Sequence, residues 1–418
     1  MKKVTIDGSL YKTKKEIRQY IKPQIIYIPL ENKLGVTYKH LIKEGDYVYK
    51  GQVVAINEEL GFPLHSSVSG NVITGTKKLM NTGKKIKCVV VENDFKEKYE
   101  INLGAKRDIS KYSKNEFLEL LKNCGITGLG GSDYPTYIKY SASDEIKYLI
   151  VNGVECEPYV ACDKAIMREY PEEILEAIDA ILEIMDISKC YIGVKINDYK
   201  TINKFSKYIG TYPNIKMYGV EDYYPAGWQK NLVRDVLKVD YKKNPMEKGI
   251  IVSNVSTIYA IYEMLKYNRP LTERVITVTG SGVKPVNVKV KIGASMSEII
   301  NYLEGYKNIK NPLFIAGGPL MGKSLPSDDL VVTKDLNCVM VVSEQKEKEL
   351  PCINCGKCIS VCPVNLLPIE IKRRVDRGKK TNNLRVNSCI DCGLCAYICP
   401  SKINLRESID KAKEVINK

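Results

Sequence analysis

The stretch CINCGKCISVCP at residues 352–363 decides the fold of the C-terminal part of the chain, and its pattern returns as CIDCGLCAYICP at residues 389–400. Each run holds four cysteines at the spacing C-x2-C-x2-C-x3-C, and a proline follows the last one. The two-residue gaps let three thiolates of one tight loop bind one iron–sulfur cubane, while the fourth thiolate points toward a second cubane. The two runs therefore predict two 4Fe-4S clusters that lie close together.

The ligands of these clusters are predicted to be crossed between the two runs. The first cluster takes Cys352, Cys355, Cys358 and Cys399, and the second takes Cys389, Cys392, Cys395 and Cys362. Zinc is the alternative, although zinc sites usually join paired cysteines across a longer loop in one tetrahedral centre. We therefore predict a two-cluster ferredoxin domain over residues 345–418. Because such clusters carry single electrons and select no substrate, the function must depend on the residues that precede them.

The composition is that of a folded protein with several domains. The chain has 418 residues, of which 44% are hydrophobic and 27% are charged, and this length exceeds what a single core usually organises. No apolar run reaches the roughly 18 to 20 residues of a membrane-spanning helix. No secretory signal is indicated at the N-terminus. We therefore expect a cytoplasmic protein that contacts the inner face of the membrane only peripherally, through its partners.

The net charge of +15 is spread along the chain. Because the lysines do not gather with aromatic residues in one patch, a nucleic-acid partner is not predicted. The most basic run is KRRVDRGKKTNNLR at residues 372–385. We interpret it first as a solvated helix face and second as a docking surface for an acidic protein.

Residues 1–100 are predicted to form a small β module. Short runs of Val, Ile and Tyr alternate with glycine turns in HLIKEGDYVYKGQVVA (40–55) and HSSVSGNVITG (65–75), which is typical of short antiparallel strands. The pattern resembles the barrel-sandwich hybrid of biotinyl and lipoyl domains. Those domains present a modifiable lysine on a hairpin, and INEELGFPLHSS (56–67) has none, so a carrier role is not predicted.

The middle of the chain alternates between helical and strand patterns. SKNEFLELLKNCG opens a helix at Ser113 with Glu116 three residues on, which is a capping box. Strand-like and helix-like segments then follow in turn, so residues 110–268 are predicted to form an α/β domain with a partly parallel sheet. Residues 269–340 return to β-branched runs around a Gly-Val-Lys-Pro turn and a short helix.

A candidate ligand site lies in the α/β domain. The loop GLGGSDYPTYIK (128–139) is rich in glycine, which alone marks an ordinary turn more often than a phosphate site. The segment VNGVECEPYVACDK (151–164) adds Asn152, Glu155, Glu157 and Asp163 at the end of a predicted strand. Ligands of open α/β folds bind at the carboxyl ends of strands. A polar surface loop is the alternative for this acidic segment.

These two segments carry a resemblance to a known family. Together they are similar to the FMN-binding subunit of respiratory complex I. The order of β module, flavin domain, β-grasp (SLBB-like) segment and two-cluster ferredoxin domain, with GGPLMG at 317–322, resembles the C subunit of the Rnf electron-transport complex (RnfC) over nearly the whole chain. Related proteins with this layout include the RnfC-like protein that accompanies D-proline reductase. The resemblance therefore implies a multidomain α/β and α+β protein.

The resemblance also implies FMN, bound non-covalently against the glycine loop. The residues that it places around FMN are Gly128, Gly130, Gly131, Lys139, Asn152, Glu155, Glu157, Asp163, Asn254 and Thr257. Flavin accepts two electrons together and releases them singly, and 4Fe-4S clusters accept them one at a time. The glycines permit close approach to the flavin, and Lys139 can offset the charge of its phosphate.

Two residues depart from the family pattern. Asp133 replaces a glycine in the glycine loop, and Gln229 stands where relatives usually carry a glutamate. In relatives of complex I these positions lie near the flavin and nicotinamide pocket. We therefore expect the added carboxylate of Asp133 to repel a dinucleotide phosphate unless a cation pairs with it. This expectation bears on NADH rather than on FMN.

Two functional interpretations remain open at this point. The first is an NADH-dependent oxidoreductase component, which passes electrons between NADH and a redox protein through FMN and two 4Fe-4S clusters. Its partner is either a D-proline reductase-type enzyme or the other Rnf subunits. The second interpretation is a non-enzymatic iron–sulfur relay or adaptor with a vestigial flavin site. Flavin content and NADH-dependent dye reduction distinguish the two.

Overall fold

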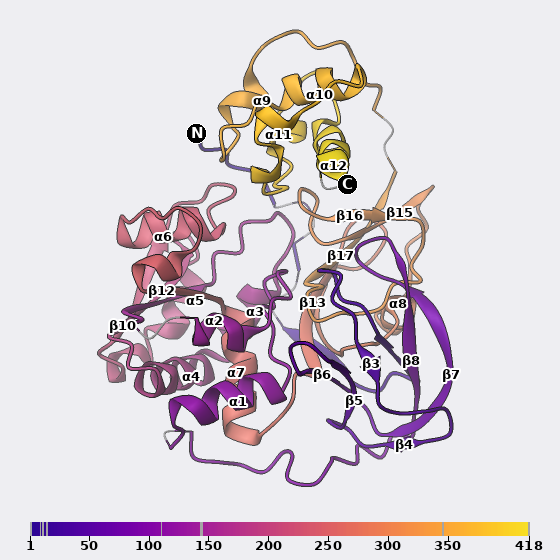
Figure 1. Ribbon diagram of the computed structural model, residues 1–418, viewed down its shortest axis with the longest axis vertical. Helices are drawn as coiled ribbons and strands as arrows, with labels where there is room; N and C mark the ends of the chain where they lie inside the picture. The colour runs from indigo at the N-terminus through magenta and orange to yellow at the C-terminus, as the bar shows by residue number, and fades with distance from the viewer. Residues whose placement is uncertain are drawn as a thin grey trace.

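The computed structural model describes residues 2–8, 10, 12–13, 16–109, 111–142, 145–344 and 347–416. The predicted domain limits at residues 1, 110, 345 and 418 lie outside these ranges. Figure 1 shows the α/β part on one side, the two β parts beside it, and the cysteine-rich part above them. Within the described residues, no helix is long and apolar enough to span a membrane.

The N-terminal β part consists of two antiparallel sheets. The larger sheet contains, in spatial order, β2 (Ile25–Pro29), β8 (Lys85–Asn93), β7 (Gly70–Leu79) and β4 (Tyr47–Val48). The smaller sheet contains β3 (Lys39–His40), β5 (Val53–Asn57) and β6 (Phe62–His65). Val48, Val54, Val72 and Val91 are buried in one core with residues of the third part. The alternation of buried valines with polar residues thus gives the predicted barrel-sandwich hybrid.

The α/β part is built on a four-stranded parallel sheet. Its strands, in spatial order, are β11 (Ile215–Val220), β10 (Lys189–Lys195), β9 (Tyr148–Asn152) and β12 (Ile250–Asn254). Its helices are α1 (Lys114–Asn123), α2 (Thr136–Ser141), α3 (Cys162–Glu169), α4 (Pro171–Ile184), α5 (Tyr199–Phe205), α6 (Gln229–Leu237) and α7 (Val255–Tyr267). The capping box at Ser113 and Glu116 is formed.

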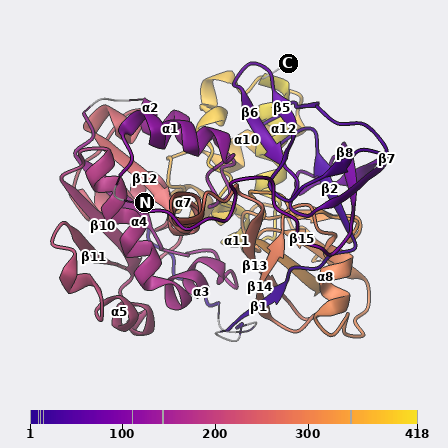
Figure 2. The same ribbon diagram turned by 90° about the horizontal axis from the view of Figure 1, so that it is seen from below.

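The position of α7 links this sheet to the rest of the molecule. Figure 2 shows α7 in the middle, between the parallel sheet and β13 (Glu273–Thr279). Its apolar residues Ile258 and Ile261 share one core with Val275 of β13. The carboxyl ends of β9 and β12 are adjacent, because Asn152 pairs in register with Asn254. Two residues predicted from separate motifs are therefore neighbours at one edge of the sheet.

The third part has the strand order of a β-grasp fold. Its strands, in spatial order, are β14 (Val286–Lys291), β13, β17 (Cys338–Ser343), β15 (Pro312–Ala316) and β16 (Lys323–Leu325), and its helix is α8 (Met296–Tyr302). β13 runs parallel to β17 and antiparallel to β14. A further strand, β1 (Ile17–Tyr20), pairs in parallel with β14. The N-terminal segment therefore extends the third sheet, which its sequence position within residues 1–100 did not indicate.

The cysteine-rich part repeats one unit twice. Each four-cysteine run contains a short helix, α9 (Lys357–Ser360) or α11 (Leu394–Tyr397), and longer helices follow as α10 (Pro368–Asp376) and α12 (Leu405–Ile416). Gly356 and Gly393 precede the short helices with φ of 70° and 72°, a left-handed conformation that glycine adopts without strain. The repeat of conformation follows the repeat of sequence.

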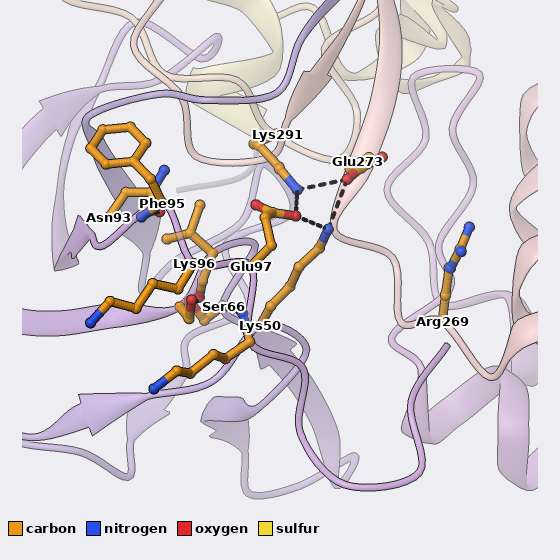
Figure 3. A network of polar contacts seen from close by, with 12 residues as sticks. Lys50, Ser66, Asn93, Phe95, Lys96, Glu97, Arg269, Glu273 and Lys291 are labelled. Carbon is orange, nitrogen blue, oxygen red and sulfur yellow. Dashed lines mark hydrogen bonds and ion pairs between the residues drawn. The ribbon is translucent and has the colours of Figure 1, made fainter. Parts of the chain in front are cut away.

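A buried ionic network joins the two β parts (Figure 3). Lys50 of the first part lies 2.5 Å from Glu97 and 3.4 Å from Glu273, and Lys291 lies 3.2 Å and 2.7 Å from the same two carboxylates. Burial opposes ionisation of Glu273, but Lys291, Lys289 and Lys50 outweigh it and hold its pKa well below the usual range. Because each charge has partners, the network fixes how the two parts meet.

Candidate functional site

A large cavity opens at the carboxyl ends of β9 and β12. Its volume is about 720 Å³, which is within the size of ordinary cofactor sites. All ten residues predicted around FMN line it, namely Gly128, Gly130, Gly131, Lys139, Asn152, Glu155, Glu157, Asp163, Asn254 and Thr257. The structure thus brings the glycine loop, the acidic segment and the start of α7 into one site.

The glycine loop is closed on itself and tied to α7. The amide of Gly128 donates to the Tyr134 carbonyl at 3.0 Å, and the amide of Leu129 donates to Thr257 Oγ1 at 2.9 Å. Gly131 has φ of 98°, and a Cβ added there would meet no atom of the described residues within 4 Å. The loop therefore presents bare backbone to the cavity at Gly131, as close approach of a ligand requires.

Lys139 is a partly buried cation at the wall of the cavity. Its Nζ donates to the Val252 carbonyl at 2.9 Å, and burial lowers its pKa to about 8. No carboxylate pairs with Lys139 within the described part of the chain. A buried ammonium without a counter-ion is costly, so this site fits an anionic group such as the FMN phosphate.

Two of the acidic residues hold the protein itself together. Glu155 accepts hydrogen bonds from the amides of Asp163 at 3.0 Å and Lys164 at 3.2 Å, at the start of α3. Asp163 accepts from Asn254 Nδ2 at 2.6 Å and from the Ser256 hydroxyl, at the start of α7. Burial, with Asp163 nearby, raises the pKa of Glu155 to about 7. These carboxylates therefore fix the two helices that frame the cavity.

Glu157 and Asn152 support other segments of the wall. Glu157 Oε1 accepts from the amides of Leu320 at 2.7 Å and Met321 at 2.9 Å. Asn152 Nδ2 donates to the Gly227 carbonyl at 2.9 Å. Glu157 Oε2 has no hydrogen-bond partner among the residues described. A buried carboxylate oxygen without a partner is unusual, and it agrees with a cavity that receives a polar ligand.

The expectation for Asp133 is corrected by the structure. Asp133 is 5% exposed, has φ of 53°, and lines a smaller cavity with Tyr38 and Lys334 rather than the large one. Burial and the neighbouring Asp335 raise its pKa to about 7. Asp133 is not among the residues that line the large cavity. Asp133 therefore does not crowd a nucleotide there, whereas Gln229 does line the cavity.

Several lining residues were missed in the sequence. They come from the N-terminal β part (Lys33, Asn81 and Thr82), the α/β part (Trp228) and the third part (Lys323, Asp335, Leu336 and Asn337). Their positions depend on how the parts pack, which no local motif encodes. Trp228 is the only tryptophan of the chain. Its place directly before Gln229 is a signal in the sequence that could have marked Trp228 as a lining residue.

The second cysteine run meets the same cavity. Ile390 and Cys392 lie in its wall, whereas Cys355 is exposed on the far run. Burial raises the pKa of Cys392, and its thiol neighbour is Cys362. Burial likewise raises the pKa of Cys358, whose thiol neighbours are Cys399 and Cys352. The thiols thus gather in two groups that mix the runs, as crossed ligation requires.

Family models match three segments of the chain. The Nuo51 FMN-binding domain matches residues 121–263, the RnfC barrel sandwich hybrid domain matches residues 7–96, and a 4Fe-4S dicluster domain matches residues 351–403. With the cavity and the thiol groups, these matches define the class of the protein. It is an iron–sulfur flavoprotein that transfers electrons, and its cofactors are FMN and two 4Fe-4S clusters.

Curated relatives give the family. The chain is 30% identical over 361 residues to the C subunit of the Na(+)-translocating ferredoxin:NAD(+) oxidoreductase complex of Acetobacterium woodii, covering 84% of this chain and 81% of that protein. It is also 30% identical to the C subunit of the ion-translocating oxidoreductase complex of Rhodobacter capsulatus, covering 87% and 72%. The chain therefore belongs to the RnfC family, as predicted.

Two further comparisons bear on length and fold. The corresponding C subunit of Haemophilus influenzae (strain PittEE) is 34% identical, and the matched region covers 82% of this chain but 54% of that protein. Among solved structures, a chain of an NAD+-reducing [NiFe]-hydrogenase in the air-oxidised state aligns with a TM-score of 0.52 at 12% identity. The alignment covers 72% of this chain and 63% of the hydrogenase chain. At that identity the similarity concerns the fold alone.

Proposed function

We propose that the chain passes electrons between NADH and a redox protein through FMN and two 4Fe-4S clusters. The observation that carries the proposal is the presence of Cys392 in the wall of the cavity that gathers the ten predicted residues. When bound, FMN exchanges electron pairs with NADH and single electrons with the clusters. The chain supplies the binding site, the position of the cofactors and the exclusion of water.

The proposed flavin residues fall into two groups. Gly128, Gly130 and Gly131 offer backbone to the flavin, and Lys139 balances the phosphate. The others frame the cavity or hold these groups in place, namely Asn152, Glu155, Glu157, Asp163, Asn254 and Thr257. The proposed domains remain 1–100, 110–268, 269–340 and 345–418, and β1 of the first completes the sheet of the third.

The proposed clusters stand in a defined order. Cys389, Cys392, Cys395 and Cys362 hold the inner cluster, and Cys352, Cys355, Cys358 and Cys399 hold the outer one. The outer run carries the exposed apolar side chain of Ile353, which is 67% exposed, and the exposed Lys357, and Leu350 just before the run is 52% exposed. Arg373 donates to Asn354 of this run. Exposed apolar side chains together with the cations Lys357 and Arg373 support docking of an acidic redox protein there.

The names of the relatives support other Rnf subunits as the partner rather than a D-proline reductase-type enzyme. On this proposal the chain sits at the inner face of the cell membrane through those subunits. A soluble carrier role is the alternative. Co-purification of the tagged chain from the native membrane fraction, against the soluble fraction, separates the two. Recovery with D-proline reductase from the soluble fraction would reject the Rnf assignment.

The proposed function is tested on anaerobically purified protein. We expect extractable FMN, about eight irons per chain and NADH-dependent reduction of a viologen dye. Clusters without flavin, and no reduction by NADH, would instead support the iron–sulfur relay with a vestigial flavin site. Because Trp228 lines the cavity, quenching of its fluorescence reports FMN binding in every variant below.

Gly131→Ala should weaken FMN binding. Alanine in this left-handed conformation costs about 1–2 kcal/mol of stability, and its methyl group would enter the cavity rather than meet protein. Gly104, with φ of 83° and equally free space, is the matched control. Both variants should lose similar stability in thermal unfolding, but only Gly131→Ala should show a raised Kd in FMN titration. Equal Kd values would place Gly131 away from the flavin.

Gln229→Glu should lower the KM for NADH. Gln229 lines the cavity, and its Nε2 donates to the Tyr241 hydroxyl at 3.3 Å. A carboxylate there accepts stronger hydrogen bonds from ribose hydroxyls, which is worth about 1 kcal/mol or roughly fivefold in affinity. Gln19→Glu, on the exposed face of β1, should leave the KM unchanged. Stopped-flow flavin reduction measures both, and an unchanged KM in Gln229→Glu would remove this residue from the NADH site.

A further inference from the structure

One loop lies between the flavin cavity and the ferredoxin part. It is formed by residues 317–322 (GGPLMG) between β15 and β16, and we call it the coupling loop. From the α/β side, Glu157 Oε1 binds the amides of Leu320 and Met321 at 2.7 and 2.9 Å. From the ferredoxin side, Arg406 of α12 donates to the carbonyls of Leu320 at 2.6 Å, Met321 at 2.9 Å and Gly322 at 3.1 Å. The same peptide groups are thus held from both sides by opposite charges.

Close packing accompanies these hydrogen bonds. A Cβ on Gly318 would overlap Glu157 Cγ, and a Cβ on Gly393 would lie 2.5 Å from the Leu320 carbonyl oxygen. Leu320 is buried in a cluster that also contains Val361 and Leu394 of the ferredoxin part. Contacts this close leave little freedom for the loop to shift. The loop is therefore closely packed between the α/β part and the ferredoxin part.

Tyr224 forms a second, direct link. It is 1% exposed, and its hydroxyl donates to the Cys392 carbonyl at 2.9 Å. Burial, with Glu157 nearby, raises its pKa far above the usual range, so the hydroxyl remains a donor. Its amide donates to the Val4 carbonyl at 2.9 Å, and the Lys2 amide donates to the Ser360 carbonyl at 3.0 Å. The N-terminal segment thus forms hydrogen bonds with both the α/β part and the ferredoxin part and links them.

We propose that Glu157, Tyr224 and Arg406 are positioning residues for electron transfer between the flavin and the inner cluster. This inference rests on the proposed role of Cys392 as a cluster ligand. Cys392 lines the cavity, so the separation of the two cofactors depends on the position of its segment, and a loosely held segment would let this separation vary. Tunnelling between carriers falls exponentially with their separation, so a displacement of the Cys392 segment away from the cavity slows the transfer. Contacts of Glu157, Tyr224 and Arg406 therefore hold the flavin cavity and the Cys392 segment at a fixed separation.

The test compares Arg406→Met with Arg377→Met, an exposed arginine of the same part. In the anaerobic holoprotein, flavin is reduced by NADH and bleaching of the clusters is followed by stopped flow. We expect Arg406→Met to keep its FMN and its iron, to slow transfer severalfold, and to speed amide hydrogen exchange of residues 317–322. Arg377→Met should match the wild type in all three measurements.

Tyr224→Phe provides an independent variant, because it keeps the ring and removes the hydroxyl, which donates to the Cys392 carbonyl and lies near Glu157. It should slow transfer less than Arg406→Met and leave hydrogen exchange of the coupling loop unchanged. The inference would be overturned if Tyr224→Phe transferred electrons at the wild-type rate and Arg406→Met, with its iron retained, did so as well. Absence of clusters in the wild type would instead overturn the proposed function.

Discussion

Cys392→Ser should reduce the iron content from about eight to about four atoms per chain. The flavin should still be reduced, but its electrons should not pass on to a cluster. Cys392 is the cysteine of the two runs that lines the flavin cavity. Its loss removes the cluster through which electrons leave, while the flavin residues stay in place. FMN content and reduction of the flavin by NADH should therefore remain, and bleaching of the remaining cluster should become far slower.

Cys355→Ser is the matched variant, because it removes one ligand of the outer run at an exposed position. It should also retain about four irons, but the flavin should still reduce the inner cluster at the wild-type rate. Transfer to a partner protein should then fail. The reverse pattern, with fast bleaching in Cys392→Ser and slow bleaching in Cys355→Ser, would invert the proposed order. Cys88→Ser, in β8 outside the runs, controls for loss of a buried thiol.

The cluster ligands were predicted from a local rule of spacing, whereas the set of flavin residues was predicted from the resemblance to the RnfC family. A C-x2-C-x2-C loop can wrap one cubane in few ways. Asn152 and Asn254 follow strands, and the carboxyl ends of parallel strands meet at one edge. Once β9 and β12 pair in register, these two residues must be neighbours. The register of β9 and β12 therefore explains why two residues taken from separate family motifs line one cavity.

The misjudged residues depend on backbone conformation and on packing between parts. Asp133 shares its loop with Gly131, yet it lines the smaller cavity and Gly131 lines the large one. Lys33 reaches the cavity from the N-terminal β part and donates to the Gly131 carbonyl. Neither fact follows from spacing, because a loop of this composition allows several conformations. The structure was needed to separate residues that line the cavity from residues that lie beside it.

Glu157 illustrates a role that a motif conceals. The family pattern places this glutamate at the flavin, and it does line the cavity. One of its oxygens, however, is used by the amides of the coupling loop. A carboxylate with two oxygens can serve both purposes, since each oxygen accepts separately. Recognition of the motif therefore gave the location of Glu157 but not its contact with the part that carries the clusters.

Lys139→Met should raise the Kd for FMN about 10- to 150-fold at pH 7.5. A hydrogen bond to a charged group contributes about 1.5–3 kcal/mol, which corresponds to that range. Burial holds the pKa of Lys139 near 8, so the wild-type cation is lost as the pH rises above 8. Wild-type affinity should consequently fall between pH 7.5 and 9.5, above the titration of Glu155 near pH 7. The methionine variant should show no such fall.

The same burial predicts an opposite effect on stability of the flavin-free protein. A lysine whose pKa falls from 10.5 to about 8 on folding destabilises the folded state below pH 8 by about 3 kcal/mol, and this cost is relieved as the pH rises toward 10.5. Lys139→Met should therefore unfold at a higher temperature than the wild type at pH 7.5 while binding FMN less well. Lys147→Met, at an exposed position before β9, should change neither. A variant that lost both stability and FMN affinity would show that Lys139 supports the fold. A cation that serves an anionic ligand should instead give a higher unfolding temperature and a weaker affinity for FMN when it is removed.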